Sequence, residues 1–190
     1  MTDRIFRRYD AAEARAHRDL VEDVYRRAYS AAIAADDPFE SPEAFMTRFD
    51  AYTAPDRASR FELVTVTVDN TVVGQTWGWP LGPNSAWWRG LHLDDPDTDH
   101  TAFIDESGQR TFALSEIMVD PEYTGQGLAH SLHDELLNAR SEERATLLVD
   151  PENPAAYTAY RKWGWARAGT LTPDWPDAPT FDVLMFKLGR

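Results

Sequence analysis

Two glycines at the boundary between a strand pattern and a helix pattern could bind an anion. Residues 112–119 alternate as a half-buried strand does, and Leu128, Leu132 and Leu136 recur at helical spacing. Gly125 and Gly127 lie where the period changes. Because glycine has no Cβ, the backbone can turn tightly there, so that amide N–H groups and a helix N-terminus point at one spot. Such a spot favours an anion, most naturally a phosphate.

The sequence around these glycines separates this turn from other phosphate-binding motifs. An ordinary turn would also explain two glycines before a helix. The run lacks the Lys-Ser/Thr that follows the last glycine of a P-loop, and it lacks the three-glycine dinucleotide fingerprint. The run from Thr124 to Ala129 instead resembles the acyl-CoA-binding motif of the GCN5-related N-acetyltransferases (GNAT), Arg/Gln-x-x-Gly-x-Gly/Ala. Gly127 and Ala129 occupy the last two fixed places, and Thr124 stands where Arg or Gln is usual.

A second segment is similar to the same family. Residues 153–165 contain an Asn, a short helical stretch with Tyr160, and then Gly164 followed by an aromatic residue. The two segments occur in the family's order. The resemblance implies acetyl-CoA as cosubstrate and contacts with it from two strand residues, the glycine turn and the Asn. These residues are Met118, Val119, Thr124, Gly125, Gln126, Gly127, Leu128, Ala129 and Asn153.

Two side chains are candidates for proton transfer during acetylation of an amine. A primary amine with a pKa near ~10 is mostly protonated at neutral pH and must lose a proton before it attacks. Glu116 matches the place where several family members keep a base, acting directly or through water; a solvated carboxylate at a strand edge is the alternative. Tyr160 matches the family's general acid, and packing on the sheet is its alternative role. The chain shows no recognisable activated nucleophile, which favours direct transfer over an acyl-enzyme.

Composition limits the class of protein and its partners. The chain has 190 residues, 43% of them hydrophobic, so it can bury a core without disulfides, and it has no cysteine. The first residues are too polar for a signal peptide and no apolar run could span a bilayer, so we expect a cytoplasmic protein. A net charge of −13 argues against nucleic acid or an anionic membrane as partner. A homodimer is left open.

The element pattern predicts an α/β fold. Strands are expected at 4–9, 61–68, 71–79, 111–119, 145–149, 165–171 and 181–188, and helices at 11–35, from 41 onward, at 127–143 and in 153–163. This order is that of the GNAT family. The resemblance implies one domain over 1–190, with a mixed, mostly antiparallel central sheet flanked by helices. Between the third and fourth strands, residues 80–110 form a long inserted loop.

The inserted loop is expected to face the acceptor. It carries the acidic run 94–99 and two adjacent tryptophans, and a cation can be attracted by the carboxylates while aromatic rings pack on it. Trp87, Trp88, Asp94 and Asp95 are the proposed acceptor-binding residues; a solvated acidic loop is the alternative. Asp95, Asp97, Asp99 and Glu106 match a calcium-loop spacing, but His100 replaces the glycine of its sharp turn, so no metal is expected.

The sequence therefore predicts an acetyl-CoA-dependent N-acetyltransferase for an amine of a small, cationic molecule. Two alternatives remain: acetylation of a protein N-terminus or lysine, and a non-catalytic acyl-CoA-binding module. On the helix after the glycine turn, His133 lies off the leucine stripe and is expected at the surface.

Overall fold

The computed structural model describes residues 3–55, 60–174 and 178–189. Its strands are β1 (Arg4–Tyr9), β2 (Glu62–Val68), β3 (Thr71–Pro80), β4 (Leu91–Leu93), β5 (Thr111–Val119), β6 (Arg144–Val149), β7 (Ala166–Leu171) and β8 (Phe181–Lys187). Its α-helices are α1 (Ala11–Ala16), α2 (Arg18–Ala28), α3 (Ser30–Ala34), α4 (Pro42–Tyr52), α5 (His100–Ile104), α6 (Leu128–Leu137) and α7 (Pro154–Lys162), and single 3₁₀ turns are η1 (Pro38–Glu40), η2 (Ala86–Trp88) and η3 (Pro121–Tyr123).

The α/β fold predicted from the sequence is confirmed. The hydrogen-bonded strand order is β1-β2-β3-β5-β6-β8-β7-β4. β5 and β6 run parallel, whereas β1–β2, β2–β3, β6–β8, β7–β8 and β4–β7 are antiparallel. The chain divides into two compact units, and β5 runs from one into the other: the first holds residues 1–79 and 116–139, and the second holds 80–115 and 140–190.

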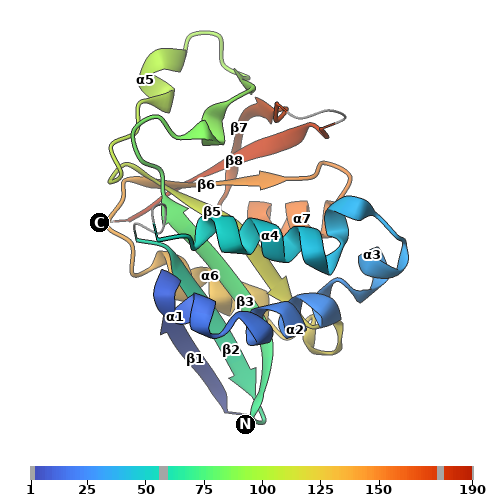
Figure 1. The fold of residues 1–190 in the computed structure, drawn as a ribbon. Coiled ribbons are helices and arrows are strands. Elements are labelled where there is room, and N and C mark those ends of the chain that lie inside the picture. Colours follow the sequence, from blue (N-terminus) through green and yellow to red (C-terminus); the bar gives the residue numbers. More distant parts are fainter. Residues whose placement is uncertain (1–2, 56–59, 175–177, 190) are drawn as a thin grey trace. The chain divides into compact units, whose positions relative to one another are not determined.

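The first unit is a β1-β2-β3 sheet with helices on both faces. Figure 1 shows α1, α2 and α4 on one face of these strands and α6 on the other. The β2–β3 hairpin turns at Asp69 and Asn70, whose φ angles of 48° and 64° are the left-handed values that a tight hairpin requires. Gln75 donates to the carbonyl of Val21 on α2, which fixes this helix against β3. On the opposite face, a Cβ at Gly74 would lie 3.1 Å from the side chain of Leu132 on α6.

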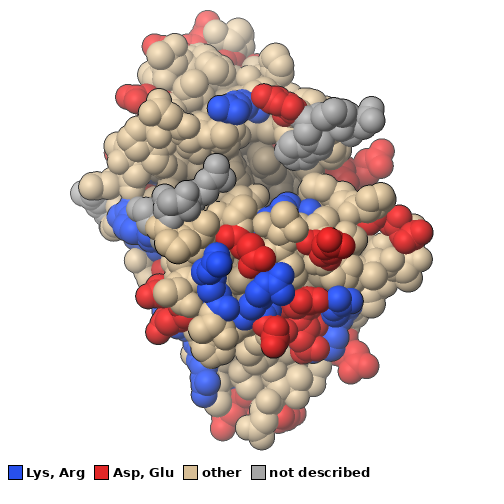
Figure 2. Space-filling view, viewed as in Figure 1, with Lys and Arg blue, Asp and Glu red and all other residues tan. Residues whose placement is uncertain are grey.

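An aromatic cluster fills the space between the sheet and α2 and α4. The rings of Tyr25 and Phe45 are stacked with centroids 3.6 Å apart, and the Phe45 ring lies 5.4 Å from that of Trp77. Phe49 on α4 packs against the same Trp77, and all four side chains are buried. The apolar faces predicted for the helix beginning near residue 41 and for the leucine stripe of α6 are therefore confirmed. Over this helical face, acidic and basic side chains are interspersed (Figure 2) and pair locally, as Arg18 does with Glu22 and Asp50.

The second unit is built on β6, β7 and β8. Trp165 packs on Phe186 of β8 with centroids 5.3 Å apart. At another place in this unit, the buried Glu106 carboxylate accepts from Trp88 Nε1 at 3.0 Å and from Thr111 Oγ1 at 2.6 Å. Arg144 supplies the compensating charge, with Nη2 3.3 Å from Oε1 of Glu106.

Three predicted elements differ from the structure. The prediction of a single helix at 11–35 is wrong, because this segment forms α1, α2 and α3. His17 and Tyr29 separate the three helices, with φ angles of −105° and −107° and ψ angles of 27° and 20°. The helix expected at 127–143 ends at Leu137. The segment 80–110 is not a plain loop, since it contains β4, which pairs with β7, and α5.

No helix in the described residues is both long and apolar enough to cross a membrane.

Candidate active site

The glycine turn has an open side where a ligand could approach. Gly125 and Gly127 have φ angles of +73° and +78°, which L-residues with a side chain rarely adopt. A Cβ placed on either residue would meet no atom within 4 Å. Gly127 is the N-cap of α6 and offers no side-chain oxygen to the first amides of the helix. The turn therefore leaves backbone N–H groups and the positive end of α6 beside empty space.

The backbone before the turn is held firmly. The amide of Asp120 donates to the carbonyl of Val73 on β3 at 2.8 Å, and one Asp120 carboxylate oxygen accepts from the amide of Glu122. The hydroxyl of Thr124 donates to the carbonyl of Pro121 at 2.8 Å. Thr124, which stands where the family has Arg or Gln, thus stabilises the local turn.

Glu116 points toward the α2 and α4 face of the first unit. Met118 is buried on that face, since its sulfur lies 3.4 Å from Nε2 of Gln75, which itself binds α2. Val119 points to the other face, where it approaches Gly74. Side chains alternate along a strand, so Glu116 shares the face of Met118. Its backbone carbonyl is held by the hydroxyl of Thr76 at 2.7 Å.

The surroundings of Glu116 favour a carboxyl group that exchanges a proton near neutral pH. Burial raises the pKa of Glu116 to about 7; the guanidinium of Arg48 opposes this shift, and the negative charge of Glu40 adds to it. Among the described residues, no side chain forms a hydrogen bond or ion pair with this half-buried carboxylate. A base with such a pKa is partly ionised at neutral pH and can accept a proton from an ammonium ion.

Sequence reasoning missed the residues around Glu116. Besides burial, Arg48 on α4 and Glu40 in η1 shift the pKa of Glu116. Burial raises the pKa of Tyr25 on α2, and Glu116 in turn raises it further. The only sequence signal in these elements was the helical spacing of their apolar residues. That spacing predicts helices, but it does not identify a Glu in a short turn as part of a site. Tertiary packing brings these charged groups within electrostatic reach of β5.

The second catalytic candidate, Tyr160, belongs to the second unit. Its side chain is buried, and its ring forms T-shaped contacts with Trp163 and Trp165, whose centroids lie 5.5 and 6.1 Å away. Asn153 is the N-cap of α7, with Oδ1 accepting from the amide of Ala156 at 3.1 Å. Of the predicted site residues, Glu116, Met118, Val119 and 124–129 thus lie in the first unit, and Tyr160 and Asn153 in the second.

The predicted acceptor-binding residues all lie in the second unit, and most make local contacts. Trp88 is buried and bound to Glu106, whereas Trp87 is half-buried. Asp94 pairs with Arg167 at 2.5 Å. Asp95 accepts from the amide of Asp97 and the hydroxyl of Thr98. Their role toward an acceptor stays a prediction.

The calcium-like spacing has a structural explanation. Asp99 caps α5, with Oδ1 accepting from the amide of Ala102, and Glu106 is buried in its bond to Trp88. The carboxylates at the fifth and twelfth places of the pattern thus serve separate local contacts.

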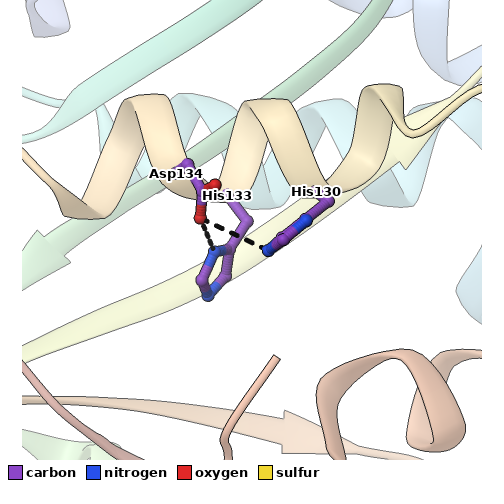
Figure 3. A group of neighbouring side chains, drawn as sticks. All are labelled: His130, His133 and Asp134. Atoms are coloured by element: carbon purple, nitrogen blue, oxygen red, sulfur yellow. Dashed lines mark hydrogen bonds and ion pairs between the residues drawn. The ribbon is translucent and has the colours of Figure 1, made fainter. Parts of the chain in front are cut away.

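Three side chains of α6 form a further polar group, drawn in Figure 3. Nδ1 of His133 lies 2.9 Å from Oδ1 of Asp134, and Nε2 of His130 lies 3.6 Å from the same oxygen. Their potential ligand atoms lie within 4.8 Å of one another. The expectation that His133 is at the surface is wrong: its exposed fraction is 2%, and burial lowers its pKa despite the hydrogen bond to Asp134. A buried neutral imidazole bound to Asp134 accounts for this contact.

The residues of the glycine turn fit acetyl-CoA. An open cradle at two left-handed glycines, followed by a helix without a side-chain cap, provides backbone donors for a pyrophosphate. Because no side chain fills this space, the phosphate groups can approach the backbone closely.

Comparison with known proteins assigns the chain to a family of acetyltransferases. The family model described as acetyltransferase (GNAT) family matches residues 21–165. Among curated proteins, no sequence matches the chain. The chain resembles the solved structure of the ribosomal-protein-S18-alanine N-acetyltransferase from Escherichia coli, at 14% identity, 99% coverage of this chain, 96% of that chain and a TM-score of 0.62.

Two further solved structures are similar. The first is the PaiA N-acetyltransferase from Thermoplasma acidophilum in complex with coenzyme A, at 12% identity, 97% and 99% coverage and a TM-score of 0.57. The second is an acetyltransferase from Thermus thermophilus, at 12% identity, 97% coverage of both chains and a TM-score of 0.61. At these identities the likeness shows the fold alone, whereas the family model spans most of the chain. The chain therefore belongs to the GNAT family of acetyltransferases and is an enzyme that uses acetyl-CoA as cosubstrate.

Proposed function

We propose that the enzyme transfers the acetyl group of acetyl-CoA directly to a primary amine of a small, cationic molecule in the cytoplasm. The observation that carries this proposal is the placement of Glu116 on β5, the strand that leads into the open glycine turn. Its burial without a described partner and its pKa of about 7 suit a group that deprotonates an ammonium ion. The absence of cysteine and the lack of an activated nucleophile favour transfer without an acyl-enzyme.

Each catalytic residue has a defined task in this proposal. Acetyl-CoA supplies the thioester when bound, held by the backbone of residues 124–129 together with Met118, Val119 and Asn153. Glu116 accepts the proton of the ammonium ion, so that the nitrogen lone pair becomes available. Tyr160 donates a proton to the departing thiolate. The phenol hydroxyl of a tyrosine is a hydrogen-bond and proton donor at neutral pH, which suits this task.

Release of free CoA from acetyl-CoA tests the proposal. Because the chain has no cysteine, a thiol-reactive dye reports only the thiol of the product. The panel of acceptors would contain benzylamine, 1,4-diaminobutane, lysine, spermidine and a peptide with a free N-terminus. We expect turnover of at least one small amine that depends on Glu116. Turnover of the peptide alone would favour a protein acetyltransferase, and no release above background with any amine would contradict the proposal.

A further inference from the structure

A second carboxylate, that of Glu40, lies within electrostatic reach of Glu116. Its negative charge acts on Glu116, and the charge of Glu116 acts in turn on Tyr25, the hydrogen-bond partner of Glu40. Glu40 belongs to η1, a single turn that Asp37 caps through the amide of Phe39. Ser41, the next residue, caps α4. The position of Glu40 is thus fixed from both sides of a short turn.

Tyr25 holds the Glu40 side chain. The Tyr25 hydroxyl lies 2.8 Å from Oε2 of Glu40 and 2.9 Å from its backbone carbonyl oxygen. The Tyr25 ring is buried and stacked on Phe45, so the hydroxyl has a defined position. Burial first, and the bond to Glu40 second, raise the pKa of Tyr25 far above its ordinary value. The hydroxyl therefore remains a donor, and the carboxylate of Glu40 remains its acceptor.

No cation in the described part of the chain forms an ion pair with either carboxylate. Arg48 is the positively charged group that acts on Glu116. Its guanidinium lies over the Phe39 ring at 4.1 Å from the centroid and donates to the Phe39 carbonyl. Arg48 thus acts on Glu116 from a distance, while its own hydrogen bond goes to a backbone carbonyl.

The neighbouring aromatic cluster also contains an unused donor. Nε1 of Trp77 is buried and has no acceptor among the described residues. Trp77 packs against Phe45, the ring stacked on Tyr25. Trp77 lies on the strand face that carries Gln75, the face toward which Met118 and Glu116 point. A buried polar group without a partner costs free energy, which a bound molecule or water can recover.

We propose that Glu40, positioned by Tyr25, is a specificity-determining residue that binds the acceptor's ammonium group opposite Glu116. The inference rests on the proposed function, since it names what the Glu116 site recognises. The ammonium ion supplies the ion-pair partner that neither carboxylate has among the described residues. One of its protons passes to Glu116, and the nitrogen lone pair is freed. The acceptor is therefore a compact primary ammonium ion rather than a neutral amine.

Binding of benzylammonium, measured without turnover, tests this proposal. The full chain with ¹³C-labelled glutamate carboxyls is saturated with CoA, and the Glu116 signal is identified by its loss in Glu116→Gln. Benzylammonium is then titrated into wild type, Glu40→Gln and Glu43→Gln. Glu43 is a matched control, because it lies exposed on the first turn of α4 and its substitution changes the charge equally.

Wild type and Glu43→Gln should bind benzylammonium with the same dissociation constant, and Glu40→Gln about tenfold or more weakly, as expected for a lost charge-assisted hydrogen bond. In Glu40→Gln the Glu116 signal should also titrate at lower pH, because a neighbouring negative charge is removed while Arg48 and Tyr25 stay. Tyr25→Phe should weaken binding, and adding it to Glu40→Gln should have little further effect. Equal affinities, or an unchanged Glu116 titration, would overturn the inference. Absence of CoA release with every amine would instead contradict the proposed function.

Discussion

Arg27 on α2 donates from Nε to Oδ2 of Asp120, 2.8 Å away, immediately after the last residue of β5. The same guanidinium donates from Nη2 to the carbonyl of Val72 on β3. The side chain of Asp120 is only 9% exposed, and its second oxygen accepts from the amide of Glu122 in η3. This contact ties α2 to the point where the chain leaves the strand of Glu116 and enters the glycine turn.

Removing this contact should loosen the glycine turn. Asp120→Ala removes the acceptor of Arg27 Nε and of the Glu122 amide, which should cost about 2 kcal/mol of unfolding free energy, measured by urea denaturation. Acetyl-CoA affinity, measured by calorimetry, should fall as well. Glu122→Ala is the control, because Glu122 is exposed and changes the charge of the same turn. Equal effects of the two substitutions would show that Asp120 does not anchor the turn.

The open side of Gly127 gives a sharper prediction on the cosubstrate. Gly127→Ala adds a methyl group in the space proposed for the pyrophosphate, and acetyl-CoA affinity should fall at least tenfold, about 1.4 kcal/mol. A side chain also strains the left-handed backbone, so the control must share that conformation. Gly108 has a φ of +81° and equally open space, so Gly108→Ala reproduces the strain in the second unit. Calorimetry showing equal affinity in Gly127→Ala and wild type would contradict the cradle.

Local sequence pattern predicted those parts of the fold that local physics determines. The hairpin at Asp69 and Asn70, the apolar stripe of α6 and the strand before the glycine turn each depend on residues close in sequence. The pairing of β4 with β7 does not. It requires Gly169, where a Cβ would lie 2.1 Å from the carbonyl oxygen of His92. A close approach between segments so far apart in sequence leaves no periodic signal.

The candidate site, like the fold, has one part that local sequence predicts and another that depends on packing between distant segments. Glu116 and the glycine turn were found because they lie on one strand-turn-helix segment that resembles a family motif. Arg48 and Glu40 act on Glu116 from other elements, and only packing brings them within reach. The prediction for His133 was wrong because helical spacing identifies the centre of an apolar stripe but not how far burial extends beside it. Asp134 binds the imidazole that becomes buried there.

Tyr160→Phe separates acid catalysis from packing. Phenylalanine keeps the ring that faces Trp163 and Trp165 and removes only the hydroxyl. The turnover number should fall by roughly ten- to a thousandfold, the range of general acid catalysis, with little change in melting temperature. Tyr157→Phe is the control on the same helix, since its hydroxyl binds Asp182. If both variants keep the wild-type turnover number, Tyr160 serves packing only.

The acidic segment of the second unit can be tested independently of Glu40. If Asp94 and Asp95 recruit a cationic acceptor, their joint replacement with Asn should raise the Michaelis constant for the amine and spare acetyl-CoA affinity. The effect should shrink with added salt, because exposed charges are screened beyond about 8 Å at physiological ionic strength. Arg167→Gln, which removes the partner of Asp94, should leave the salt dependence in place. A Michaelis constant that does not respond to the double replacement at any salt concentration would assign both aspartates to local structure.

The raised pKa of Glu116 also predicts how stability depends on pH. In the unfolded chain this carboxyl has its ordinary pKa of 4.5, whereas burial, with the charge of Glu40 and against that of Arg48, raises it to about 7 in the folded enzyme. Between these two values the folded state binds more protons than the unfolded state, so this group makes stability fall as pH rises from about 4.5 to about 7.

Glu116→Gln mimics the protonated form and removes that loss. The melting temperatures of Glu116→Gln and wild type should therefore agree at pH 4, and the variant should be the more stable at pH 8. Because Glu40 contributes to the shift, Glu40→Gln should show a smaller gain at pH 8, and Glu43→Gln none. A difference between Glu116→Gln and wild type that is the same at both pH values would mean that the folded and unfolded states share one pKa at this position.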